Sequence, residues 1–511
     1  MIARVHSSIM TGIDAIACEV EVDVSKGGMG ELKLVGLADA AVRESISRIQ
    51  AALRNSGYRW PGPKVTINLA PADVRKDSAA FDLPIALCSL IAGAQIESHI
   101  ADNYIIAGEL ALDGRVRPVK GALATAMLAS RLGKTGVILP VENAREAAVV
   151  DDIEVIPVRF LSDAVGVLSG DLPLDPTGVN IDEVFAQSGK YDIDFGDVRG
   201  QESAKRALCI SAAGHHNILM IGPPGSGKTM LSKRIPTILP PLTLAESLET
   251  TRIYSARGLL KPGQSLLAKR PVRTPHHSAS AASLIGGGAI PQPGEISLAH
   301  HGVLFLDEFP EFARTTLEMV RQPLEDGCVT IPRVHATLRF PASIMLVAAM
   351  NPCPCGYYTD PKRPCKCSQK QVTSYISRLS GPLIDRIDIH VEVPPVPFSQ
   401  LRGDSKGMTS AQMSEIVTRT REIQRDRFDK TGKSTTTNAT MTPQQVRQFC
   451  KLDPGGEMLL KQAMTELGLS ARAHDKVLRI ARTIADIENQ ADIQTQHVAE
   501  AIQYRKLDRQ F

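Results

Sequence analysis

A glycine-rich loop that ends in a lysine and a threonine could bind the phosphates of a nucleotide. It follows a short apolar run at residues 218–221 and precedes a stretch of helical periodicity that begins at Met230. Glycines let backbone N–H groups turn toward phosphate oxygens, and the start of the following helix adds its dipole. Lys228 would meet the β- and γ-phosphates, and Thr229 would bind Mg²⁺. The predicted P-loop for ATP consists of Gly222, Pro223, Pro224, Gly225, Ser226, Gly227, Lys228 and Thr229.

Two adjacent acids lie further along the chain, at the end of another apolar run, residues 302–306. P-loop ATPases hold their Mg²⁺ with a carboxylate at the end of such a strand. Asp307 would hold Mg²⁺ through a water molecule, and Glu308 would polarise the attacking water. An acid pair favours hydrolysis over binding alone, so we expect an ATPase.

Three further polar residues could complete this chemistry. Asn351 ends the apolar run at residues 343–350 and could orient the attacking water between Glu308 and the γ-phosphate. Arg386 and Arg472 are candidates for the cation that stabilises negative charge on the transferred phosphoryl group. By spacing alone, each arginine could equally form a surface ion pair.

Four of the nine cysteines, Cys353, Cys355, Cys365 and Cys367, form a C-x-C-x₉-C-x-C pattern. Four thiolates can close a tetrahedral Zn²⁺ site, which is structural because no coordination position stays open. The pattern therefore predicts structural zinc, and an iron–sulfur cluster or free thiols are the alternatives. Three pairs of adjacent histidines are expected to pack or form hydrogen bonds rather than bind a second metal; they lie at 215–216, 276–277 and 300–301.

The composition is that of an ordinary soluble globular protein. The 511 residues include 58 Lys and Arg against 55 Asp and Glu, and 43% are hydrophobic. These values exclude collagen-like, disordered and disulfide-scaffold classes. No apolar run reaches the roughly 18 residues of a membrane span, and no secretory signal pattern starts the chain. We therefore expect a cytoplasmic protein without a membrane segment.

The pattern of apolar residues divides the chain into an α/β protein with a helical end. Residues 1–170 alternate predicted strands and helices and are expected to form one mixed α/β domain. Residues 171–195 are rich in Gly, Pro and Asp and are predicted to be a linker. The P-loop lies in a second α/β block at 196–395, and 396–511 is expected to be a small helical bundle.

The second half, with these motifs in order, resembles the AAA+ ATPases of the magnesium-chelatase and MCM branch. The resemblance identifies Asn351 as sensor 1, Arg472 as sensor 2 and residues 396–511 as a helical lid. It also implies that Arg386 is a finger that reaches the ATP of a neighbouring subunit. A homo-oligomeric ring, usually a hexamer, follows from that arrangement.

The whole chain resembles the bacterial ComM/YifB family still more closely. The motifs are Arg-Thr-Pro-His-His-Ser at 273–278, Pro-Gly-Glu at 293–295 and Asn-Pro-Cys-Pro-Cys-Gly at 351–356. This resemblance implies a DNA helicase that couples ATP hydrolysis to branch migration during recombination of incoming DNA in natural transformation. The principal alternative is a chelatase-type ATPase that remodels a protein partner. A third is a zinc-stabilised assembly factor that needs ATP binding alone.

Single-stranded or branched DNA would need a local basic surface, because the net charge is only +3. The resemblance to ring ATPases implies that residues 286–294 line the pore and that a hairpin at 329–339 enters it. The predicted contacts are Arg333 in that hairpin and Lys362 and Arg363 in the cysteine loop. An ordinary flexible loop is the alternative for residues 286–294, and a solvated charged loop is the alternative for the cysteine loop. No base-reading motif is present, so binding should tolerate any sequence and weaken with salt.

The N-terminal domain resembles the Lon-type protease fold, of the ribosomal S5 domain 2-like class. The protease positions for the catalytic serine and lysine align with Ala80 and Leu123, so we expect the domain to be inactive. Ser78 and Lys120 lie within three residues of those positions, and a shifted register could restore a Ser–Lys pair. The expected role is a scaffold or a binding surface.

Overall fold

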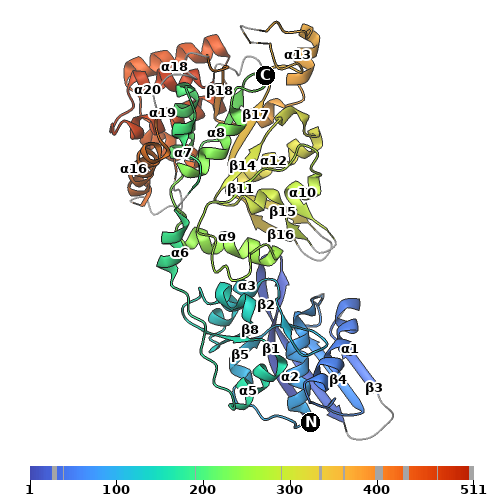
Figure 1. Cartoon of the computed structure of the whole chain (residues 1–511). Helices are drawn as coiled ribbons and strands as arrows, with labels where there is room; N and C mark the ends of the chain where they lie inside the picture. Colours follow the sequence, from blue (N-terminus) through green and yellow to red (C-terminus); the bar gives the residue numbers. More distant parts are fainter. Residues whose placement is uncertain are drawn as a thin grey trace. The chain divides into compact units, whose positions relative to one another are not determined.

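The computed structural model divides the chain into two compact α/β units (Figure 1). The first comprises Met1–Ser188 together with Thr243–Ala268, and the second comprises Gly189–Leu242 together with Lys269–Phe511. This mixed α/β architecture with a helical C-terminal region confirms the predicted fold class. The structure describes residues 1–25, 31–37, 39–76, 78–189, 191–288, 291–332, 337–358, 360, 363–397, 407–429, 437–468 and 470–505.

The first unit is built on a seven-stranded sheet in the order β3-β4-β2-β1-β5-β8-β9. Alternate residues of its long strands are buried, as expected where one sheet face meets the core; Val20 and Val22 are examples. The strands are β1 (Ile2–Thr11), β2 (Asp14–Ser25), β3 (Glu31–Val35), β4 (Lys64–Ala70), β5 (Tyr104–Ile106), β8 (Gly136–Pro140) and β9 (Glu154–Val158).

Helices of the first unit pack against this sheet, and one of them, α2, is almost entirely buried. Its core position explains its largely apolar sequence, which only Asp82 and Ser89 interrupt. The helix α6 lies inside the segment predicted to be a linker, where Val184 and Phe185 pack against the apolar side chains of Leu123 and Leu266. The helices are α1 (Ala40–Asn55), α2 (Asp82–Ala92), α3 (Ala122–Arg131), α4 (Val141–Ala147), α5 (Leu161–Ser169) and α6 (Ile181–Ser188).

The segment Thr243–Ala268 belongs to the first unit by packing, although its neighbours in sequence belong to the second. It contains α9 (Leu244–Arg257), which begins with a capping box formed by Thr243 and Glu246. The buried residues of α9 carry hydroxyl groups, with Ile253 as the one large apolar side chain among them. The Ser247 hydroxyl donates a hydrogen bond to the Leu267 carbonyl oxygen, and the Thr251 hydroxyl accepts one from the Leu267 N–H, each at 2.9 Å.

The second unit contains a five-stranded parallel sheet in the order β11-β14-β17-β10-β18. Its inner strands are continuous apolar runs because helices cover both faces. All five carboxyl ends lie at one edge, and this edge receives the loops that carry the predicted nucleotide site. The strands are β10 (Ile218–Ile221), β11 (Val272–Arg273), β14 (Val303–Leu306), β17 (Met345–Met350) and β18 (Ile389–Glu392).

Between the strands lie the helices and two short hairpins of the nucleotide-binding core. The first hairpin pairs β12 (Gly286–Gly287) with β13 (Gln292–Pro293). The second pairs β15 (Cys328–Pro332) with β16 (Thr337–Pro341), which confirms the hairpin predicted at 329–339. The helices are α7 (Glu202–Gly214), α8 (Lys228–Arg234), α10 (Ala281–Ile285), α11 (Glu295–Leu298), α12 (Arg314–Asp326), α13 (Gln369–Ile376) and α14 (Gly381–Ile384).

The C-terminal region is helical, as predicted, and shares one apolar core with the parallel sheet. Met413 and Ile480 bury their side chains in the same cluster as Ile218 and Val347. No helix in the described part of the chain is long and apolar enough to cross a membrane. The helices are α16 (Ser410–Asp429), α17 (Pro443–Phe449), α18 (Pro454–Leu467), α19 (Ala471–Ile487) and α20 (Thr495–Gln503).

Glu146 of α4 is a buried acid beside α9, and burial raises its pKa from 4.5 to about 7. Asn143 donates a hydrogen bond to it at 3.0 Å, and the Ser255 hydroxyl lies at 3.5 Å. Because the folded pKa exceeds the unfolded one, the first unit should lose stability as pH rises from about 4.5 to about 7, by at most ~3 kcal/mol.

Glu146→Gln keeps the hydrogen-bond acceptor but cannot ionise, so it should reduce this loss of stability. The measurement is the free energy of unfolding in urea at pH 5 and at pH 8. Exposed Glu142 on the same helix is the matched control, and an unchanged slope in Glu146→Gln would refute the prediction.

Candidate active site

The predicted P-loop joins the carboxyl end of β10 to the first residue of α8. Gly225 and Gly227 adopt φ values of +76° and +96°, where a side chain would be strained. At Gly222 an added Cβ would lie 2.2 Å from the carbonyl oxygen of Val393. The loop therefore needs glycine at these three positions, as its sequence pattern implied.

The ammonium group of Lys228 lies inside this loop. Its Nζ donates to the carbonyl oxygens of Gly222 at 2.7 Å and Pro223 at 2.9 Å. Burial lowers the pKa of Lys228 to about 8, and the carboxylate of Asp307 opposes that shift. Phosphate oxygens at this position would supply the negative charge that a buried ammonium requires.

The two residues predicted to serve Mg²⁺ meet across the sheet edge. Thr229 donates its hydroxyl hydrogen to Asp307 Oδ2 at 2.7 Å, and the backbone N–H of Glu308 donates to Asp307 Oδ1 at 2.9 Å. A hydroxyl and a carboxylate oxygen are the ligands that Mg²⁺ takes beside nucleotide phosphates. The residues present therefore fit an ATP–Mg²⁺ complex.

Glu308, the predicted general base, contacts a histidine whose role the sequence did not reveal. His277 Nδ1 lies 2.9 Å from Glu308 Oε2. The ring of His277 also packs, as predicted, against His276 at 4.1 Å and edge-on to Phe312 at 6.5 Å between centroids. Glu308 itself has φ +51°, which turns its side chain at the end of β14. No local pattern marks this contact, because His277 follows a different strand, β11.

Asn351 lies at the end of β17, between the P-loop strand and the strand that carries the acids. Its Oδ1 is 3.3 Å from Lys228 Nζ. The structure thus brings together Lys228, Thr229, Asp307, Glu308 and Asn351 at one edge of the sheet. This arrangement can bind a nucleoside triphosphate, hold a metal ion beside it and orient a water molecule.

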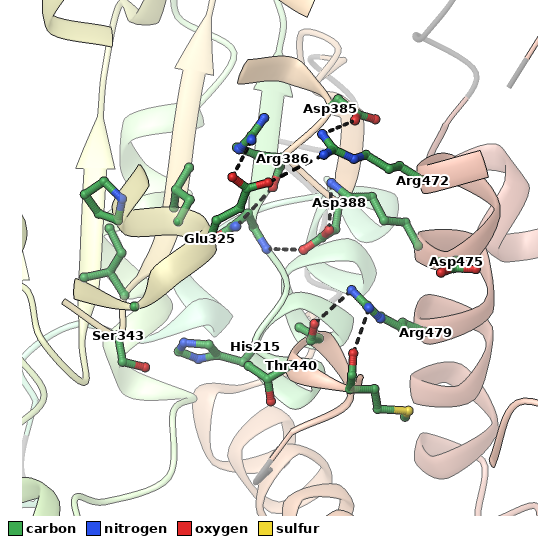
Figure 2. Close-up of a pocket in the computed structure, with 18 of the residues that line it drawn as sticks. His215, Glu325, Ser343, Asp385, Arg386, Asp388, Thr440, Arg472, Asp475 and Arg479 are labelled. Carbon is green, nitrogen blue, oxygen red and sulfur yellow. Dashed lines mark hydrogen bonds and ion pairs between the residues drawn. The ribbon is translucent and has the colours of Figure 1, made fainter. Parts of the chain in front are cut away.

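Arg386 and Arg472 lie at the other end of the sheet. Arg386 precedes the amino end of β18, whose residue Ile389 pairs with Ile218 at the amino end of β10. Since the four residues of β10 span ~13 Å, the arginine is separated from its own P-loop by at least the length of the strand. Both arginines line a pocket of about 470 Å³ and face the carboxylate of Glu325 (Figure 2).

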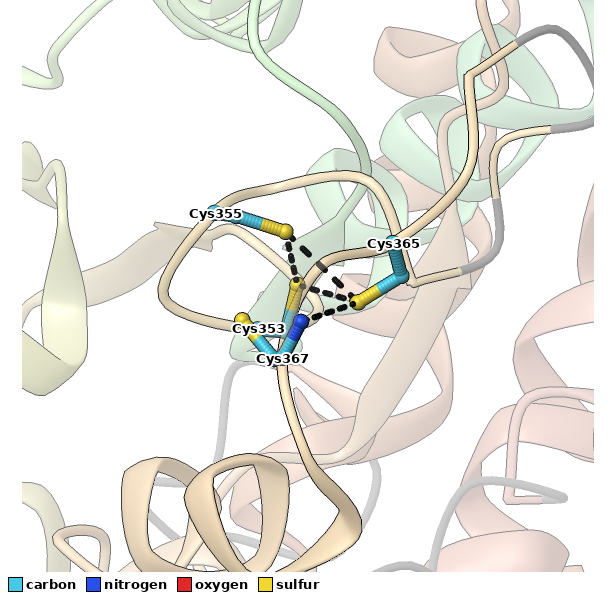
Figure 3. Close-up of side chains that lie close together, drawn as sticks. All are labelled: Cys353, Cys355, Cys365 and Cys367. Carbon is cyan, nitrogen blue, oxygen red and sulfur yellow. Dashed lines mark hydrogen bonds between the residues drawn. The ribbon is translucent and has the colours of Figure 1, made fainter.

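The four cysteine sulfurs converge in the loop that follows Asn351 (Figure 3). Cys353 Sγ lies 3.3 Å from Cys355 Sγ and 3.7 Å from Cys365 Sγ, and the Cys355–Cys365 distance is 3.6 Å. The four sulfurs, including that of Cys367, all lie within 4.8 Å of one another. A tetrahedral zinc–thiolate site has sulfur–sulfur distances of ~3.8 Å. The cluster therefore fits a Zn²⁺ ion.

The surroundings shift the pKa values of these cysteines in opposite directions. Backbone N–H groups of Tyr357 and Lys366 lower the pKa of Cys355 to about 6, which favours the metal-binding thiolate. The Cys367 N–H acts in the same direction on Cys365, but partial burial and the sulfurs of Cys355 and Cys353 raise that pKa to about 12. A divalent cation among these sulfurs would stabilise the thiolate form of all of them.

The cysteine loop packs directly on the P-loop. Gly356 has φ +87°, and an added Cβ there would lie 2.5 Å from Pro224 Cδ. This close approach makes the conformation of the cysteine loop part of the wall of the nucleotide site. Sequence spacing could not reveal it, because the two loops are more than a hundred residues apart.

The three predicted DNA contacts are only partly described. Arg333 and Lys362 lie outside the described residues. Arg363 is exposed, donates to the Tyr357 hydroxyl at 3.0 Å and stacks over the Tyr357 ring at 5.3 Å. The described pair β12–β13 lies within the predicted pore segment 286–294.

The Lon-like positions of the first unit carry no nucleophile or base. Ala80 presents a methyl group, and Leu123 is fully buried in a cluster with Leu266 of the inserted segment. The Ser78 hydroxyl accepts a hydrogen bond from the Ala80 backbone N–H at 3.1 Å. The side chain of Lys120 runs beside Gly258, at the end of α9.

Comparison with known proteins covers nearly the whole chain. Three family models match: "Magnesium chelatase, subunit ChlI" at residues 194–401, "Subunit ChlI of Mg-chelatase" at 20–143 and its C-terminal model at 407–505. The competence protein ComM of Haemophilus influenzae is 42% identical over 99% of this chain and 98% of its own length. Escherichia coli YifB, described as uncharacterized, is 42% identical over 99% of this chain and 97% of its own. The Lon protease of Vibrio parahaemolyticus is 27% identical over 34% of this chain and 22% of its own.

Proposed function

Because the chain belongs to the ComM/YifB family of magnesium-chelatase-like AAA+ proteins, we propose that it is a cytoplasmic ATPase that moves along DNA. It works as a homo-oligomeric ring, most simply a hexamer. As a helicase it drives branch migration on single-stranded or branched DNA when incoming strands recombine in natural transformation. The name of the Haemophilus relative, a competence protein, supports this setting.

One observation carries the proposal: the chemistry is divided between the two ends of the sheet. Lys228, Thr229, Asp307, Glu308 and Asn351 can bind and activate the nucleotide, but no arginine among the described residues contacts them. The transferred phosphoryl group needs a cation in direct contact.

Arg386 and Arg472 are the candidates for that cation, and they lie at the opposite end of the same chain. The site is therefore completed by the arginines of a neighbouring protomer. Repeating this head-to-tail contact closes a ring.

Bound Mg²⁺ supplies charge neutralisation of the β- and γ-phosphates. Lys228 binds the phosphates, Thr229 and Asp307 hold the metal, and Glu308 accepts a proton from the attacking water. Asn351 orients that water. The neighbour's Arg386 and Arg472 stabilise the negative charge that develops on the leaving oxygen and on the oxygens of the transferred phosphoryl group.

DNA engages basic residues of the pore-side loops, with Arg333, Lys362 and Arg363 as contacts. The test is the ATPase rate with and without single-stranded, duplex and four-way DNA at two salt concentrations. We expect single-stranded or four-way DNA to stimulate the ATPase rate, and this stimulation to weaken as salt rises. In Arg333→Ala the logarithm of DNA affinity should fall less steeply with the logarithm of salt concentration, by about one unit of slope for the lost phosphate contact. A rate indifferent to every DNA would refute a DNA motor.

A protein-remodelling ATPase is the second candidate, and the match to all three models of a chelatase subunit favours it. The same assay separates the two functions. Stimulation only by a protein partner, with no response to DNA, would support the remodelling function.

The cysteine loop holds a structural Zn²⁺ that stiffens the wall of the nucleotide site. We expect about one zinc per chain by elemental analysis, and Cys365→Ser should lose most of it, since the site is closed by four ligands. Because Gly356 of this loop packs on Pro224, the variant should also show a severalfold higher KM for ATP. Cys209→Ala, a buried thiol in α7, is the control. Iron in place of zinc, or full activity without metal, would contradict the prediction.

The first unit acts as a scaffold rather than as a protease. Its Lon-like positions carry Ala80 and buried Leu123, and Leu123 packs against a segment that leaves and rejoins the ATPase sequence. Peptidase assays with the full chain should therefore give no turnover.

A further inference from the structure

One carboxylate stands between the two arginines of the pocket. Glu325, in the last turn of α12, places Oε2 2.5 Å from Arg386 Nη2 and Oε1 3.9 Å from Arg472 Nη2 (Figure 2). Each oxygen therefore faces a different guanidinium. The three residues come from α12, the approach to β18 and the start of α19, so only the tertiary fold brings them together.

Arg386 is held in this pocket with hydrogen-bonding capacity to spare. Its side chain is only 10% exposed, and Nη1 donates to the carbonyl oxygen of Pro382 at 2.6 Å. Its Nε has no hydrogen-bond partner among the described residues. A buried cation of this kind is stable only beside an anion.

Glu325 is the anion that both arginines share. The hydrogen bond from Arg386 lowers the pKa of Glu325, so the side chain is a carboxylate at neutral pH. Other acids of the pocket are differently engaged: Asp388 pairs with Lys476 at 3.1 Å. Asp385 approaches Arg472 at 3.6 Å but makes no ion pair with Arg386 in the described part of the chain.

A carboxylate bound between two guanidinium groups occupies the position that a phosphate oxygen would take, because arginine binds both anions with the same geometry. The side chain is 49% exposed and lies at the end of a helix, so it can withdraw without opening the core. The γ-phosphate of a neighbour's ATP carries more negative charge than one carboxylate.

We propose that Glu325 stands in for the γ-phosphate in the free chain and is displaced by it when two protomers close on ATP. The inference rests on the proposed function, in which Arg386 and Arg472 serve the neighbouring site. Glu325 is then a positioning residue that holds Arg386 and Arg472 in place in the free chain. It also makes assembly depend on a nucleoside triphosphate, since ADP offers no γ-phosphate to replace the carboxylate.

The test compares Glu325→Gln with wild type for assembly and hydrolysis over a range of chain concentrations, in ATP and in ADP. The amide is neutral and leaves Arg386 without its carboxylate partner in the free chain, whereas Arg472 keeps Asp385 at 3.6 Å. We expect half-maximal ATPase activity at about tenfold lower chain concentration, the effect of losing one modest ion pair, and measurable rings in ADP. The kcat at saturation should stay within about twofold.

Glu318→Gln is the matched control, because Glu318 lies on the same helix and pairs with Arg321 at 2.5 Å, away from the two arginines. If Glu325→Gln does not fold, Glu325→Asp tests the same point, with a smaller shift in the same direction. A kcat that falls as far as in Arg386→Ala would overturn the inference, and so would wild-type behaviour in ADP and at every chain concentration.

Arg386→Ala in the same assay separates this inference from the function on which it rests. If that variant hydrolyses ATP like wild type, the shared active site is wrong. If that variant is inactive while Glu325→Gln matches wild type, only the role of Glu325 is wrong.

Discussion

Arg386→Ala should lower kcat for ATP hydrolysis by about 1,000-fold, the scale of losing an arginine finger, while ATP still binds. Arg386 lies at the opposite end of the sheet from its own P-loop, and we propose that it acts on the ATP of a neighbouring chain. The kcat and the Kd for ATP, measured on the same preparation, separate catalysis from binding. Arg378→Ala removes an exposed arginine that pairs with Glu311 and should leave both unchanged.

Mixing two inactive variants tests the sharing of the site. Arg386→Ala chains keep an intact P-loop, and Lys228→Ala chains keep an intact finger. Random assembly of equal amounts should restore about a quarter of the sites, each formed by one chain of either kind. No recovery in the mixture, or wild-type turnover by Arg386→Ala alone, would show that each chain completes its own site.

Glu308→Gln should lower kcat by about 100- to 10,000-fold, the contribution of a general base, and leave ATP affinity within about twofold. The amide keeps the shape of the side chain and its place beside His277, but it cannot accept a proton from water. Single-turnover hydrolysis and nucleotide binding provide the two measurements. Glu311→Gln, three residues further on, is the control.

The same variant separates a motor from an assembly factor. A motor needs hydrolysis, so Glu308→Gln should bind DNA in ATP and fail to move it. An assembly factor that needs only ATP binding would keep its function in this variant. Unimpaired activity would therefore contradict the mechanism given to Glu308.

The convergence of the candidate nucleotide-site residues could be predicted from the sequence because each part of the site is a local pattern. Lys228, Asp307 and Asn351 each follow a short apolar run, and the carboxyl ends of parallel strands meet at one edge. The cysteine cluster is likewise a local pattern. The mixed α/β class followed from the alternation of strand and helix periods.

Contacts between distant segments could not be predicted in this way. His277 contacts Glu308, and Glu325 contacts Arg386, because the fold packs distant segments together. Nothing in the local sequence of either segment indicates its partner. The buried residues of α9 are hydroxyl-bearing side chains apart from Ile253, so the apolar periodicity of this helix is weak. Its packing in the first unit therefore could not be predicted from the sequence. The sequence indicated both arginines as candidates, but it could not indicate that both face the carboxylate of Glu325.

Branch migration is the activity that tests the central claim most directly. The measurement is the conversion of a labelled four-way DNA junction to its products by the purified full-length chain in ATP and Mg²⁺. The account predicts conversion by wild type and by an equal mixture of Arg386→Ala and Lys228→Ala, and none by Glu308→Gln. A junction that wild type binds and leaves intact while it hydrolyses ATP would contradict it.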